Sequence, residues 1–179
     1  MPAGIYIEEQ GVYQIDCSRA VWSTDQVHSD YRNAGTFLSD ADFIAETDDY
    51  IYIVEYKNAT ISSQAESSGF DPTEQRIVDK IAKKFYDSLH YIRIHNKNKP
   101  VKYVFIVEYP AAGVLEREEL CDIIWDRLPF ALQTGKPAKI IEDFEVVSIA
   151  EWNEHPEYSQ FPFSPVPTRS VGNQRKKKP

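Results

Sequence analysis

Glu55-Tyr56-Lys57 closes a run of apolar residues, and Asp42 lies near the start of another such run upstream. Chance alone supplies roughly two acid-x-lysine tripeptides in so acidic a chain, so the tripeptide carries no weight by itself. Two carboxylates and a lysine can nevertheless hold a hard divalent cation and stabilise charge on a phosphate. Whether these three groups meet depends on how the two runs pair.

The runs 41–46 and 50–57 are rich in β-forming residues and flank a short acidic segment with Asp48 and Asp49. Aspartate tolerates the left-handed backbone that a tight turn needs, so the pattern predicts a β-hairpin. The second run is apolar on both faces until its end, as expected for a strand that is covered on both sides. We therefore expect the hairpin to lie centrally in a mixed sheet flanked by helices.

The register of this hairpin brings the three groups together. A two-residue turn pairs Ile44 with Ile53, and the same register places Asp42 opposite Glu55. Opposed side chains of such a pair have Cβ atoms about 4.5–5.5 Å apart on one face. The two-residue period of a strand puts Lys57 on that face as well.

Opposed carboxylates repel each other, so Asp42 and Glu55 need a compensating positive charge. A divalent cation, Mg²⁺ or Mn²⁺, would supply it and could polarise a phosphodiester, while Lys57 could orient the attacking water or stabilise charge. The alternative is a structural ion pair in which Lys57 neutralises Glu55 or Asp40, which the register places opposite Lys57. The hairpin alone leaves these two interpretations open.

A helix is predicted after the hairpin. Residues 71–74 (Asp-Pro-Thr-Glu) have the form of a helix start with a capping box, and 77–92 carries one apolar stripe at helical spacing. Four basic residues are expected on the opposite, solvent-facing arc, where they would bind nucleic acid: Arg76, Lys80, Lys83 and Lys84.

The charge is distributed unevenly. The formal net charge is −8, yet residues 76–102 hold 8 basic and 2 acidic side chains, and residues 169–179 hold 5 basic and none acidic. Such asymmetry indicates an anionic partner. A solvated helix face with a solubilising tail is the alternative.

The remaining segments complete an α/β chain that we expect to form a single domain over residues 1–160. The Pro-rich, basic segment 161–179 is expected to be an extended, flexible tail. The other predicted elements are strands near 5–7 and 12–15, a helix within 23–33, a strand over 101–109, a helix over 116–133 and a strand over 140–149.

From about Asp40 to Tyr109 the chain resembles the PD-(D/E)XK, or restriction-endonuclease-like, nuclease superfamily. The resemblance lies in an aspartate at a strand start, a hairpin, an apolar strand that ends in Glu-x-Lys, and then a helix and a strand. It implies an αβββαβ-type core and Mg²⁺-dependent phosphodiester hydrolysis, with Asp42 and Glu55 as metal ligands and Lys57 as catalytic lysine. Gln75 would match an accessory glutamine of some members. Those members often have an aromatic residue four positions later, where this chain has Asp79.

The sequence therefore predicts a metal-dependent nuclease, acting on DNA rather than RNA. A non-catalytic module that binds nucleic acid or protein and keeps the nuclease fold is the alternative. No stretch has the length and apolarity of a membrane helix, and no basic segment leads into an apolar one at the N-terminus, so we expect no membrane partner. Cys17 and Cys121 are expected to be buried thiols in a reducing cytoplasm. The sequence leaves the oligomeric state open, and a homodimer is one of the alternatives.

Overall fold

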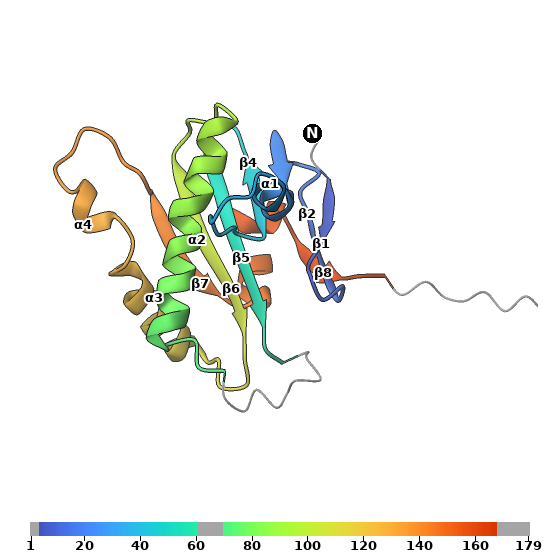
Figure 1. The fold of residues 1–179 in the computed structure, drawn as a ribbon. Coiled ribbons are helices and arrows are strands. Elements are labelled where there is room, and N and C mark those ends of the chain that lie inside the picture. The colour runs from blue at the N-terminus through green and yellow to red at the C-terminus, as the bar shows by residue number, and fades with distance from the viewer. Residues whose placement is uncertain (1–3, 61–69, 168–179) are drawn as a thin grey trace, which may run out of the picture.

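The computed structural model describes residues 4–60 and 70–167 and shows an α/β fold built around a five-stranded mixed sheet. Three strands are antiparallel neighbours, and the last two run parallel to the third. In sheet order the strands are β3 (Trp22–Thr24), β4 (Phe43–Glu46), β5 (Ile51–Asn58), β6 (Val101–Glu108) and β7 (Asp143–Val147) (Figure 1).

Both faces of this sheet are covered. One face packs against α1 (Val27–Asn33), α2 (Gln75–Ile94) and α3 (Val114–Trp125), and α2 runs along β5 and β6 (Figure 1). The short α4 (Phe130–Gln133) follows α3. The opposite face contributes its apolar side chains to a second core. From the N-terminal part of the chain this core includes residues of β2 (Tyr13–Asp16). From the C-terminal part it includes residues of α5 (Ile149–Glu154), the 3-10 turn η1 (Tyr158–Gln160) and β8 (Phe163–Pro165).

The central position predicted for the hairpin is confirmed, because β4 and β5 are the second and third strands of the sheet. The predicted register is also confirmed. Ile44 pairs with Ile53, and the Thr47 amide donates to the Tyr50 carbonyl at 2.8 Å, so Asp48 and Asp49 form the turn.

Several predicted boundaries differ from the structure. The 23–33 segment begins as β3, which pairs with β4 and precedes α1, and only its second part is helical. The expected helix over 116–133 is broken between α3 and α4, since Pro129 lacks the amide that would continue it. The start of α2 also lies later than predicted. Asp71 accepts from the amide and hydroxyl of Thr73 and so stabilises a turn before the helix.

The expected tail boundary at residue 160 is wrong. Phe161 and Phe163 are buried in the second core, and the Trp152 indole donates to the Phe161 carbonyl at 2.6 Å. β8 pairs with β2, which in turn pairs with β1 (Ile5–Ile7). The aromatic residues between the prolines have a core to fill, so this segment belongs to the domain. The basic end of the predicted tail, 168–179, lies outside the described residues.

None of the described helices combines the length and the apolar character needed to cross a membrane.

Candidate functional site

The Asp42 side chain lies at the entrance to β4, on the face of the sheet that α2 covers. Two contacts with α2 hold the segment before it: the Ser39 amide donates to Asp87 at 2.6 Å, and the Ala41 amide donates to the Ser88 hydroxyl at 3.1 Å. One carboxylate oxygen of Asp42 accepts from the Tyr56 amide at 2.7 Å. This hydrogen bond fastens Asp42 to the last part of β5, where the confirmed register places Glu55.

Glu55 is bound by a lysine from α2. The Lys84 ammonium lies 2.6 Å and 2.8 Å from the two carboxylate oxygens of Glu55, and the side chains are only 13% and 7% exposed. The structural ion pair considered from the sequence therefore exists, but Lys84 supplies its positive charge instead of Lys57. The expectation that Lys84 faces solvent on the basic arc is wrong.

The spacing of the helix explains the position of Lys84. At about 100° per residue, Lys84 falls on the same stripe as Ile77, Ile81 and Ser88, which are seven and three residues before it and four after it. The sequence signal was available, and the positive charge obscured it. The position of Lys84 on this stripe therefore directs its ammonium toward the buried acids.

Burial and mutual repulsion set the protonation of the site. Burial first, and then the neighbouring charge of Asp42, raises the pKa of Glu55 to about 8 against the opposing effect of Lys84. Burial also raises the pKa of Asp42, although Lys84 and the Tyr56 amide oppose that rise. Burial lowers the pKa of Lys84, but attraction by Glu55 and Asp42 outweighs it, so its pKa lies above the usual value. One ammonium thus serves two carboxylates, and a second positive charge would stabilise both in their ionised form.

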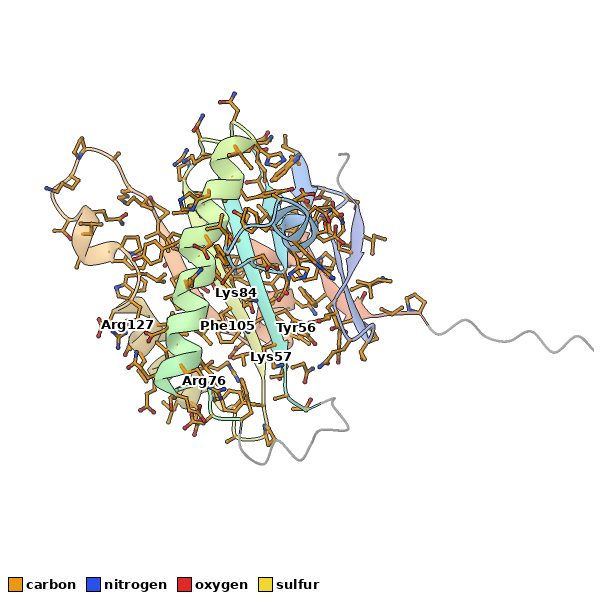
Figure 2. The ribbon with its side chains drawn as sticks, viewed as in Figure 1. Tyr56, Lys57, Arg76, Lys84, Phe105 and Arg127 are labelled. Carbon is orange, nitrogen blue, oxygen red and sulfur yellow. The ribbon has the colours of Figure 1, made fainter. Side chains whose placement is uncertain are left out.

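Lys57 lies on the same face at the open end of β5, and its side chain is exposed (Figure 2). Within residues 4–60 and 70–167 its ammonium forms no ion pair. It borders one hollow together with Glu55 and another together with Asp42. The structure therefore brings all three predicted core residues to one place and leaves the Lys57 ammonium accessible there.

Two hollows on either side of these residues carry opposite charge. The basic one is the hollow that Lys57 shares with Glu55. The acidic hollow has a volume of about 500 Å³, and five carboxylates line it against two lysines. Those carboxylates are Glu8, Glu9, Asp25, Asp40 and Asp42. The basic hollow has a volume of about 300 Å³ and lies between β5, β6 and the first turns of α2, with three cationic side chains against the single carboxylate of Glu55.

Of the remaining predicted basic residues, Arg76 and Lys80 line the basic hollow, and Lys80 also borders the acidic one. Lys83 forms an ion pair with Asp87 and does not line the basic hollow. Gln75 lies elsewhere. Its amide nitrogen donates to Asp79 at 2.7 Å, and its oxygen accepts from Arg127 at 3.0 Å, so it is directed toward the segment that follows α3 and not toward Asp42 and Glu55.

The acidic side of the site includes contacts that the sequence does not predict. His28 of α1 lies 3.1 Å from Asp40, and both line the acidic hollow. Glu8 also borders that hollow, but its carboxylate accepts from the backbone amides of Gln10, Val12 and Tyr13 and so stabilises the β1–β2 turn. No periodicity or spacing in the sequence indicates that Glu8, His28 and Asp40 line one hollow, because the sequence predicts no contact between their segments.

In the described part of the chain, no group of three or more His, Cys, Asp or Glu side chains is arranged to hold a metal ion. The candidate metal ligands are thus the carboxylate pair Asp42 and Glu55. The chain matches no protein-family model, and comparison with curated proteins and with solved structures finds no match either.

Proposed function

We propose that this protein is a Mg²⁺-dependent nuclease that hydrolyses phosphodiester bonds, with DNA as the expected substrate. The observation that carries the proposal is the hydrogen bond from the Tyr56 amide to Asp42, which holds Asp42 beside Glu55 at the end of the β4–β5 ladder, on the face where Lys57 is exposed. The restriction-endonuclease-like core belongs to the same proposal. It is supported by the central hairpin followed by a helix and a parallel strand, although β3 precedes α1 instead of following it.

The side chains fit a hard cation. Mg²⁺ is commonly held by one or two carboxylates while it keeps water ligands and contacts phosphate. Asp42 uses one oxygen for the Tyr56 amide and has the other for a ligand, and Asp42 lines the acidic hollow and Glu55 the basic one. Burial raises the pKa of both carboxyl groups, and a bound cation would offset this by favouring their ionised forms. Bound there, Mg²⁺ would withdraw charge from the phosphodiester and favour attack by water.

The lysines would have different roles. Lys57 is exposed at the mouth of the site and would orient the attacking water or stabilise the charge that grows on the phosphate. Lys84 binds both oxygens of Glu55 and opposes the rise in its pKa, which favours the ionised form that a metal needs. Hydrolysis would join the water oxygen to phosphorus with loss of a proton from the water, and the leaving sugar oxygen would take up a proton as its bond to phosphorus breaks.

One observation favours the alternative, a binding module without catalysis. The Lys84 ion pair already compensates Glu55, as a structural ion pair would. In that case Asp42, Glu55 and Lys84 stabilise the hairpin against α2, and the basic hollow is the functional surface.

A cleavage assay separates the two functions. Labelled single-stranded and duplex DNA would be incubated with wild type and with Asp42→Asn, Glu55→Gln and Lys57→Met, with and without Mg²⁺. Lys136→Gln is the matched control, because Lys136 is exposed and lines none of the hollows. We expect Mg²⁺-dependent cleavage by wild type and by the control and none by the three site variants. DNA binding without cleavage by wild type would support the binding module instead.

A further inference from the structure

The basic hollow has the composition of a subsite for one nucleotide. Its floor is apolar and consists of side chains from α2, β6 and the segment before α2: Phe70, Ile77, Ile81 and Phe105. Its rim carries the cationic groups of Lys57, Arg76 and Lys80, and Glu55 stands at one edge (Figure 2 labels Lys57, Arg76 and Phe105). A cationic rim around an apolar floor fits a ligand that is both anionic and planar.

The rim charges are available to a ligand. Among the described residues, Lys57 and Lys80 take part in no ion pair, and Arg76 has only an exposed contact of 3.1 Å with Glu74. Exposed ion pairs of this kind contribute little and are readily exchanged. The acidic hollow on the other side repels phosphate through its five carboxylates. A nucleic-acid strand that reaches Glu55 would therefore lie over the basic hollow.

The apolar floor restricts which nucleic acid can use it. In an intact duplex the bases are paired and stacked inside, so only sugar and phosphate reach a surface hollow. An unpaired nucleotide exposes its base, and bases stack on aromatic and apolar side chains in sites that hold single strands. Phe70 and Ile77 are half-buried and so offer surface to a base at this floor.

We propose that the basic hollow binds an unpaired nucleotide next to the scissile phosphate, so that the substrate class is single-stranded or frayed nucleic acid. This inference rests on the proposed function, because it uses Glu55 to locate the scissile phosphate. The base lies on the apolar floor, and the rim lysines and Arg76 neutralise its phosphates.

Binding of small probes to the metal-free protein tests this without any cleavage. Inorganic phosphate, deoxyribose 5-phosphate and dAMP would be titrated into wild type in the presence of a chelator, with calorimetry or amide chemical shifts as the readout. We expect dAMP to bind about tenfold more tightly than deoxyribose 5-phosphate, as base stacking adds in comparable sites. Single-stranded DNA should likewise bind more tightly than a blunt duplex of the same length.

Two variants separate the floor from the rim. Ile77→Gln places a polar group on the half-buried floor and should remove the advantage of dAMP over deoxyribose 5-phosphate. Lys80→Gln should weaken all three probes alike, and Lys136→Gln should weaken none. Equal binding of dAMP and deoxyribose 5-phosphate by wild type, or no binding of any probe, would overturn the inference.

The inference and the proposed function fail in different ways. If dAMP binds as expected but wild type cleaves nothing with Mg²⁺, the subsite stands and the nuclease does not. If wild type cleaves duplex DNA and dAMP shows no advantage, the nuclease stands and the subsite is wrong.

Discussion

Replacing Glu55 by glutamine should remove the loss of stability that the metal-free wild-type protein suffers as the pH rises. The folded protein raises the pKa of Glu55 from its ordinary value of 4.5 to about 8. Between these values the folded state binds more protons at this site than the unfolded state, so stability falls with rising pH. Glutamine keeps the shape of the protonated side chain and removes the titration.

The expected magnitude follows from the width of this window. One proton bound only in the folded state changes stability by roughly 1.4 kcal/mol per pH unit. Between about pH 5.5 and about pH 7.5 the free energy of unfolding of wild type should therefore fall by about 2–3 kcal/mol relative to Glu55→Gln. Urea unfolding of both proteins at several pH values, in the presence of a chelator, measures this difference.

Glu46 of the same hairpin is the matched control, since it is also buried but has two lysine partners. Burial raises the pKa of Glu46, but the hydrogen bonds and charges of Lys97 and Lys99 outweigh burial and hold that pKa below its usual value. Its contribution to stability is present above the unfolded pKa and is lost as the pH falls. Glu46→Gln should thus destabilise at neutral pH, with a loss that shrinks in acid. If the stability difference between wild type and Glu55→Gln were independent of pH, the burial and the repulsion by Asp42 that raise the pKa of Glu55 would be refuted.

The other predictions concern the lysines and the C-terminal strand. Lys84→Met removes the ammonium that opposes the rise in the Glu55 pKa, so it should destabilise the metal-free protein most above about pH 8, where Glu55 is ionised, by up to about 3–5 kcal/mol, and less at neutral pH, where Glu55 binds a proton; an unchanged urea midpoint at about pH 8.5 would contradict the ion pair. Lys57→Met should change the unfolding free energy by less than about 0.5 kcal/mol, because Lys57 is exposed, so any loss of cleavage cannot be assigned to misfolding. Phe163→Ala should lower the free energy of unfolding by about 3–5 kcal/mol, since Phe163 is 3% exposed. A thermal midpoint equal to that of wild type would show that this segment does not pack in the domain core.

The sequence predicted the parts of the fold that rest on local pattern. The alternation and apolar runs around Asp48 and Asp49 specify one register, because a shift by a single residue would move every buried side chain to the opposite face. The placement of Asp42 and Glu55 followed from that register. The apolar stripe of α2 was likewise predicted from helical spacing, and its buried residues include Val78, Ile81 and Phe85.

The parts that failed depend on tertiary contacts. Lys84 was assigned to the outer arc by its charge, although the helical period places it inward, and only the carboxylates of β4 and β5 make that burial favourable. Prolines around Phe161 and Phe163 suggested a tail, but β2 offers an edge with which β8 pairs. The acidic hollow joins elements that are distant in sequence, so no local pattern predicts it.

The central claim is that Asp42 and Glu55 together hold a divalent cation, and direct binding of Mn²⁺ tests it. Titration calorimetry or electron paramagnetic resonance would be carried out at about pH 8.5. Above the raised pKa of Glu55, the proton on its carboxyl group competes less with the metal. We expect wild type to bind Mn²⁺ and Mg²⁺ to displace it, and we expect Asp42→Asn and Glu55→Gln each to abolish the binding while Lys136→Gln does not. Absence of binding by wild type, or equal affinities in wild type and both site variants, would contradict this claim.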